Sequence, residues 1–276
     1  MAEGRHDETA SGRLASAGWN AAWRAVKGGR ETVAWNDPVV LVIVYLVAVS
    51  ALFVIWPSLD LAIARLFFAN GGFPAKNVES LIRLRALGDQ LIILILVVLA
   101  ASMLGKLVWP ERPIAIRPRS GVFLLTSLAL GPGLVVNGLF KSLSGRPRPI
   151  AIDIFGGPSP FVPAWRFSDY CASNCSFVSG EGSSSMWLMG LVFLLPKPLR
   201  LPIGILIGLV ALALSVNRLA FGGHFASDVL VAWGLTLLIQ WVLYRLIVTS
   251  PLGARIDAAV ETWLGGAGRR LRARFR

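Results

Sequence analysis

"PVVLVIVYLVAVSALFVIW", residues 38–56, is an apolar stretch without a single charged side chain. A helix of about 20 apolar residues is long enough to cross the hydrocarbon core of a bilayer. The whole chain of 276 residues agrees with this stretch, because 55% of its residues are hydrophobic, only 15% are charged, and the mean hydropathy is +0.66. A soluble domain carries about 25% charged residues. The composition therefore indicates an integral membrane protein.

Five more apolar stretches of similar character follow along the chain. They are 90–105, 121–140, 183–196, 201–216 and 228–244. The predicted fold class is all-α, a bundle of six transmembrane helices, in which 183–196 is the shortest member and begins with three serines. A solute transporter is disfavoured, because charges near the middle of the membrane mark transport paths, and the one break, at Gly131-Pro132-Gly133, has no ionisable residue beside it.

The distribution of lysine and arginine predicts the orientation. With six spans, 18 of the 27 Lys and Arg residues fall on the side of the two termini and 9 on the other. The positive-inside rule then places both termini in the cytoplasm of a multi-pass protein of the bacterial inner membrane. The net charge of +12 follows from this topology and from attraction to anionic lipid, and nucleic acid is not an expected partner because no soluble basic domain is present.

Three segments are predicted. Residues 1–35 form a cytoplasmic tail with an interfacial helix over 15–35, where Trp19, Trp23 and Val26 recur at helical spacing. Residues 36–249 form the six-span domain, and residues 250–276 form a basic cytoplasmic tail.

Polar residues gather at the ends of the spans that face away from the cytoplasm. Singly, each has an ordinary explanation, such as a lysine at a helix end or an aspartate as an N-cap. Together, the cations and a Gly/Ser loop, whose backbone N–H groups attract anions, suit a phosphate group. The group consists of Lys141, Arg146, Arg148, Glu181, Arg218, His224 and Asp228.

His224 and Asp228 are the candidates for the chemistry itself. They are four residues apart and so share one face of a helix. An aspartate held against one ring nitrogen fixes the tautomer and leaves the other nitrogen free as a nucleophile. This pair is suited to attack at phosphorus.

Two cysteines, Cys171 and Cys175, lie in the 141–182 loop. This loop is predicted to be outside the cytoplasm, where disulfides persist. Their spacing is compatible with a disulfide and equally with two free thiols.

Three blocks of sequence carry a resemblance to a known family. "KSLSGRPRP" (141–149), "VSGE" (178–181) and "NRLAFGGHFASD" (217–228) resemble, in order and spacing, the motifs of the type 2 phosphatidic acid phosphatase superfamily of membrane lipid phosphatases. The resemblance implies that His224 is the nucleophile of a phosphohistidine mechanism and that Asp228 orients it. It implies no metal and no cofactor. The phosphate-binding positions that it implies are Lys141, Arg148, Ser179, the Gly180 backbone and Arg218.

The chain departs from the family at two positions. Asn217 replaces a serine, and Glu181 replaces the histidine that serves as general acid in the family. Glu181 is therefore either a substitute general acid or the mark of a weakened site. A degenerate member that binds a lipid phosphate without hydrolysing it is the non-catalytic alternative.

The resemblance implies a phosphorylated membrane lipid as substrate, reached at the periplasmic face. The preferred expectation is lipid A, at its 1- or 4′-phosphate. Undecaprenyl diphosphate and phosphatidylglycerophosphate or phosphatidate are the alternative substrates.

Overall fold

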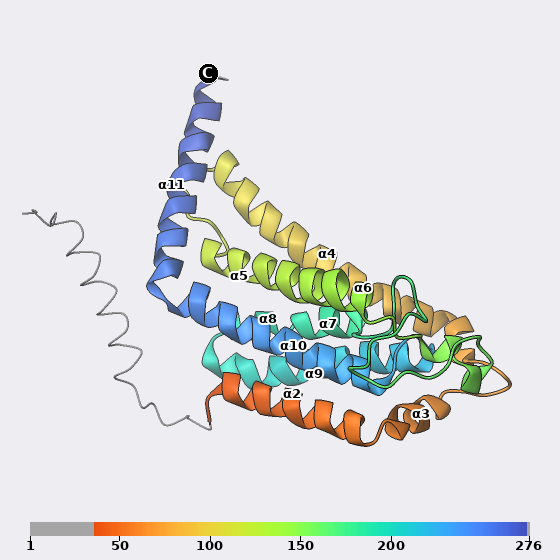
Figure 1. The fold of residues 1–276 in the computed structure, drawn as a ribbon. Coiled ribbons are helices and arrows are strands. Elements are labelled where there is room, and N and C mark those ends of the chain that lie inside the picture. The colour runs from red at the N-terminus through yellow and green to blue at the C-terminus, as the bar shows by residue number, and fades with distance from the viewer. Residues whose placement is uncertain (1–35, 275–276) are drawn as a thin grey trace, which may run out of the picture.

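The computed structural model describes residues 36–274, and this part of the chain contains five helices that are long and apolar enough to cross a membrane (Figure 1). They are Pro38–Ile55, Glu79–Val108, Pro118–Leu143, Lys197–Ala220 and Ala226–Thr249. Their large apolar side chains are widely exposed on the outer surface of the bundle, as a lipid-facing surface requires. The predicted interfacial helix over 15–35 lies outside the described residues.

The helices follow one another along the chain, with a long connection between residues 155 and 180. In order they are α2 (Pro38–Ile55), α3 (Ser58–Arg65), η1 (Pro74–Asn77), α4 (Glu79–Val108), α5 (Pro118–Leu128), η2 (Ala129–Phe140), α6 (Lys141–Leu143), η3 (Pro149–Ala151), η4 (Asp153–Phe155), α7 (Gly180–Trp187), α8 (Gly190–Leu194), α9 (Lys197–Ala220), α10 (Ala226–Leu243), η5 (Tyr244–Thr249) and α11 (Pro251–Arg274).

The prediction of six long helices is not confirmed, because the expected span 183–196 is divided into α7 and α8. The break has a visible cause. The amide of Gln240 donates a 2.7 Å hydrogen bond to the Trp187 carbonyl, and a Cβ at Gly190 would lie 2.8 Å from the same amide nitrogen. A side chain inserted into the hydrogen-bond ladder breaks a helix. Both short helices lie within the bundle, with Trp187 fully buried.

α10 forms the centre of the bundle and packs against α2 on one side and α7 on the other (Figure 1). Its residues Val231 and Ala232 are fully buried. α7 also packs against α9, and η2, which contacts α10, packs against α6. The helices that carry predicted site residues therefore contact α10 or a helix that contacts α10.

The third long helix changes its winding in the middle. After α5 the chain continues as a π-helix, η2, which contains Pro132. A proline cannot donate to the helical ladder, and here the side chain of Asn137 donates a 2.7 Å hydrogen bond to the Pro132 carbonyl. π-helical turns are rare in proteins, and those that occur often lie at functional sites. This one ends where Lys141 begins α6.

The predicted basic tail at the C-terminus is a helix, α11, which turns away from α10 and lies beside the far end of α4 (Figure 1). Asp257 accepts hydrogen bonds from the backbone and side chain of Arg119, at 2.8 and 2.6 Å. Glu261 pairs with the buried Lys106 at 2.7 Å. These contacts fix α11 against the end of the bundle opposite the predicted site residues.

Candidate active site

The eight predicted site residues come together at the end of the bundle where α6, α7, α9 and α10 meet the 144–179 loop. Lys141 lies at the start of α6, and Arg148 lies in the loop. Ser179, Gly180 and Glu181 form the beginning of α7. Arg218 lies in the last turn of α9, and His224 and Asp228 flank the start of α10.

His224 is 1% exposed and presents one ring nitrogen without a partner. Its Nδ1 lies 2.8 Å from the carbonyl oxygen of Ser176. A carbonyl only accepts hydrogen bonds, so Nδ1 carries a proton, and in the neutral imidazole Nε2 then carries the lone pair. Nε2 makes no hydrogen bond, although it is buried, and its neighbour is Glu181 Oε2 at 3.4 Å. The arrangement leaves Nε2 without a hydrogen bond and facing the start of α7.

Asp228 acts on His224 mainly through a third residue. Its Oδ2 lies 3.7 Å from His224 Nδ1, which is longer than a hydrogen bond. The same oxygen accepts hydrogen bonds from the Ser176 hydroxyl and from the Phe225 backbone, the latter at 2.8 Å. Ser176 thus connects the two residues, since its hydroxyl is held by Asp228 and its carbonyl holds the ring. Sequence reasoning did not identify Ser176, which lies outside the family motifs.

Glycines allow two cations to approach the backbone closely. A Cβ at Gly180 would lie 2.8 Å from Lys141 Nζ, and a Cβ at Gly223 would lie 2.7 Å from Arg218 Nη2. Any side chain at either position would push a cation away from the site. Ser179 caps α7 by accepting a 3.1 Å hydrogen bond from the Gly182 N–H. The remaining N–H groups of the first turn of α7 attract an anion.

Arg148 is held at the edge of the site. Its Nη2 donates to the backbone carbonyl and the side-chain oxygen of Asn174, at 2.9 and 2.8 Å. Asn174 lies within the small loop closed by a disulfide between Cys171 and Cys175, so the structure pairs the two cysteines. The positive charge of Arg148 still acts on Lys141.

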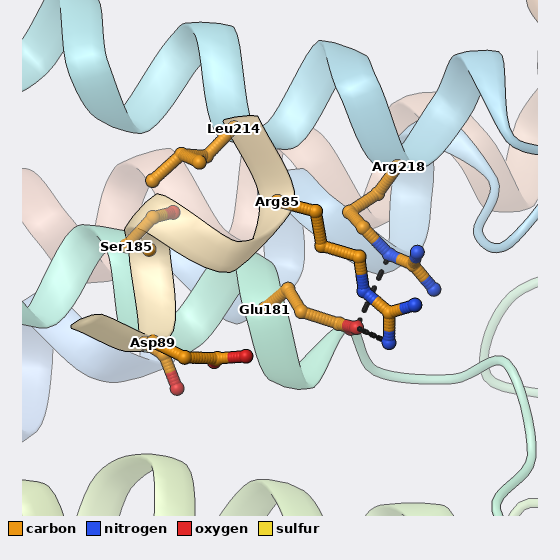
Figure 2. A pocket seen from close by; sticks show the side chains of 8 residues that line it. Arg85, Asp89, Glu181, Ser185, Leu214 and Arg218 are labelled. Atoms are coloured by element: carbon orange, nitrogen blue, oxygen red, sulfur yellow. Dashed lines mark hydrogen bonds and ion pairs between the residues drawn. The ribbon is translucent and has the colours of Figure 1, made fainter. Parts of the chain in front are cut away.

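Glu181 lies beside two arginines and opposite Nε2 of His224. Its Oε1 is 3.1 Å from Arg85 Nη2 and 3.3 Å from Arg218 Nε, as Figure 2 shows. Burial raises the pKa of the Glu181 carboxyl, but the positive charges of Arg218 and Lys141 lower it, so the pKa lies well below its ordinary value. Without substrate, Glu181 is therefore a carboxylate paired with arginines, and not a proton donor.

Arg85 is a further cation of the site that sequence reasoning missed. It projects from the first turns of α4, beside Asp89, into a pocket that Glu181 and Arg218 also line (Figure 2). Asn217, which replaces the family serine, donates a 2.8 Å hydrogen bond to the Leu81 carbonyl. This bond holds the start of α4 beside the end of α9 and brings Arg85 within reach of Glu181.

The chain matches a known family and several known proteins. A model of the PAP2 superfamily matches residues 120–251. Lipid A 4′-phosphatases from Rhizobium leguminosarum and Rhizobium etli are each 33% identical over an alignment of 205 positions, and the match covers 67% of this chain and 86% and 78% of those proteins. The chain belongs to the PAP2 superfamily.

A third relative matches over a shorter part of the chain. It is a lipid A 4′-phosphatase of Francisella tularensis subsp. novicida, 38% identical over 125 residues, which are 45% of this chain and 56% of that protein. No solved structure matches the chain. All eight predicted site residues lie inside the PAP2 match, whereas Arg85 lies before it. The PAP2 match alone therefore does not include every charged group of the site.

Proposed function

We propose that this protein is a phosphatase of lipid A that removes the 4′-phosphate through a phosphohistidine intermediate. The observation that carries this proposal is the buried His224, whose Nε2 makes no hydrogen bond and lies 3.4 Å from Glu181 Oε2 in the first turn of α7. Support for the substrate comes from two relatives at 33% identity, covered over 86% and 78% of their length, which are lipid A 4′-phosphatases. The 4′-position is thereby preferred over the 1-position.

The first step is attack of His224 Nε2 on phosphorus. The new N–P bond forms as the bond between phosphorus and the sugar oxygen breaks, and the leaving oxygen takes a proton. Lys141, Arg148 and Arg218 neutralise the charge of the transferring group, in the place of a metal ion, with the N–H groups of α7. Water then attacks the phosphohistidine, and inorganic phosphate leaves with the imidazole restored.

Glu181 changes its role when substrate binds. In the free protein the carboxylate occupies the place beside Arg218 where a phosphate oxygen would bind. A bound phosphate displaces it from the arginines and adds negative charge next to it. Both changes raise the pKa of a carboxyl group. Glu181 then binds a proton and can donate it to the leaving oxygen, as the family's histidine does.

The reaction takes place at the periplasmic face of the inner membrane in this proposal. The Lys and Arg excess on the side of the termini favours that orientation. The disulfide between Cys171 and Cys175 lies at the same end of the bundle as His224, and disulfides persist in the periplasm.

Purified protein incubated with a panel of lipid phosphates, read by mass spectrometry, tests this proposal. Lipid A should lose its 4′-phosphate, and His224→Ala should be inactive while eluting as the wild type does on size exclusion. Turnover of undecaprenyl diphosphate or phosphatidate in preference to lipid A would overturn the substrate. Binding of lipid A without turnover would identify a non-catalytic member of the family.

A further inference from the structure

Asp60 is a fully buried carboxylate that lies outside every motif of the family. It belongs to α3, a short helix that follows the first long helix, and its exposure is 0%. Its Oδ1 accepts a 2.9 Å hydrogen bond from the Ser227 N–H, and its Oδ2 accepts from the Ser227 hydroxyl at 2.6 Å and from Arg146 Nη2 at 2.8 Å. An ionised carboxylate in a protein interior requires this kind of pairing.

Arg146 connects Asp60 with the catalytic pair. It is also 0% exposed, and its Nη1 donates to Asp228 Oδ1 and to the Ser227 hydroxyl. Its Nε donates to the Val162 carbonyl at 2.8 Å. Every nitrogen of the guanidinium thus has a partner, and two of the nitrogens are bound to different carboxylates.

The charges of Asp60, Arg146 and Asp228 set the net charge next to the His224 ring. Arg146 alone would neutralise Asp228, and the imidazole would face a neutral pair. With Asp60 present, two carboxylates share one guanidinium, so one net negative charge remains next to the ring. When Nε2 bonds to phosphorus, the imidazole gains positive charge, which a nearby negative charge stabilises.

Asp60 also fixes the backbone that carries the nucleophile. Ser227 lies in the first turn of α10, three residues after His224. The Ser227 N–H donates a hydrogen bond to the Asp60 carboxylate on α3, and a carboxylate in this position stabilises the N-terminus of a helix. α3 is thereby attached to the start of α10, and the position of Asp228 relative to the ring depends on this attachment.

We propose that Asp60 is a positioning residue of the phosphatase, which holds Arg146 and the start of α10 so that the negative charge of Asp228 stays available to His224. The proposal rests on the function proposed above. Burial raises the pKa of Asp60, and the Arg146 charge acts against it. Each hydrogen bond at Asp60 is donated to it, as the carboxylate form requires.

Steady-state kinetics on three variants test this role. Asp60→Asn should lower kcat by about 10- to 100-fold, the range seen when a residue that orients a functional side chain is replaced. KM should stay within about threefold of the wild-type value, because Asp60 touches no phosphate-binding residue. The double variant Asp60→Asn/Arg146→Gln again leaves one net negative charge, on Asp228, and should recover kcat by about tenfold over Asp60→Asn. Asp257→Asn removes a carboxylate paired with Arg119 at the opposite end and should match the wild type in kcat and KM.

A merely structural role predicts that the double variant is no better than the single one. That result, or a wild-type kcat for Asp60→Asn, would overturn the proposal. If Asp60→Asn does not fold, Asp60→Glu keeps the charge but moves it, and a lower kcat at unchanged KM supports the role while an unchanged kcat rejects it. His224→Ala is measured alongside: activity there would overturn the proposed function itself, whereas a dead His224→Ala with a fully active Asp60→Asn rejects only the role of Asp60.

Discussion

The variant Glu181→Gln distinguishes two roles of Glu181, a proton donor and a carboxylate that only pairs with arginines. The change keeps the shape of the side chain and removes both its charge and its transferable proton. General acid catalysis contributes about 10² to 10⁴ in rate. We therefore expect kcat on an alkyl phosphate, which lipid A resembles at its sugar oxygen, to fall by at least about 100-fold. An aryl phosphate leaves without much help from a proton, so its loss should be smaller by about tenfold or more.

The same variant should bind inorganic phosphate more tightly. In the free protein Glu181 lies 3.1 Å from Arg85 and 3.3 Å from Arg218, and an incoming phosphate must displace it. A hydrogen bond to a charged group contributes about 1.5–3 kcal/mol, and about 1.4 kcal/mol corresponds to tenfold in affinity. Competitive inhibition by phosphate should thus strengthen on the order of tenfold in Glu181→Gln.

The assay is phosphate release by the purified protein, with inorganic phosphate as inhibitor. Glu79→Gln is the matched control, because Glu79 forms an exposed pair with Arg83 on the same helix as Arg85, and exposed pairs contribute little. It should change neither kcat nor inhibition. Equal losses of kcat on the alkyl and aryl substrates would refute the acid role, and unchanged inhibition by phosphate would refute the idea that Glu181 occupies the phosphate position.

Three more predictions concern regions around the site. Reduction of the Cys171–Cys175 disulfide should loosen the loop that holds Arg148 and raise KM by a few-fold, about 1 kcal/mol, with little change in kcat; an unchanged KM in dithiothreitol would contradict this. A cysteine at the exposed position of Ile154 should react with a membrane-impermeant thiol reagent in intact spheroplasts, since both native cysteines are bonded; labelling only after lysis would reverse the orientation. Glu261→Gln should lower Tm by about 2–4 °C, about 1 kcal/mol, at neutral pH. The hydrogen bonds from Lys106 and the Ile114 N–H lower the pKa of Glu261. The stability that the Glu261 carboxylate contributes is therefore fully present above the ordinary pKa of about 4.3 and is lost as pH falls through the lowered pKa. A Tm difference between Glu261→Gln and the wild type that persists at low pH would contradict the ion pair.

Much of the fold could be predicted from hydropathy because the long spans are continuous apolar runs. The division at 183–196 could not, since its cause is Gln240, a residue from another helix that binds the Trp187 carbonyl. A run of apolar residues carries no information about a distant side chain that interrupts its hydrogen bonds. The start of α4 was also missed, because the predicted span was the uncharged run 90–105, whereas the helix begins at Glu79 and includes the charged Arg83 and Arg85.

The residues of the candidate site could be assembled from motif spacing, but their contacts could not. Spacing places His224 and Asp228 on one face, yet the hydrogen bond that orients the ring is made by the Ser176 carbonyl. A backbone carbonyl has no sequence signature. Asp60 is likewise hidden, because nothing in a short apolar helix indicates which distant charge its one buried acid will meet.

The most direct test of the account is to look for phosphate on His224 itself. Wild-type protein is mixed with lipid A, quenched within the first turnovers under alkaline conditions that preserve phosphohistidine, and analysed by peptide mass spectrometry. We expect a phosphorylated peptide with the modification at His224. Release of phosphate at the full rate with no modification at His224, or turnover retained in His224→Ala, would contradict it.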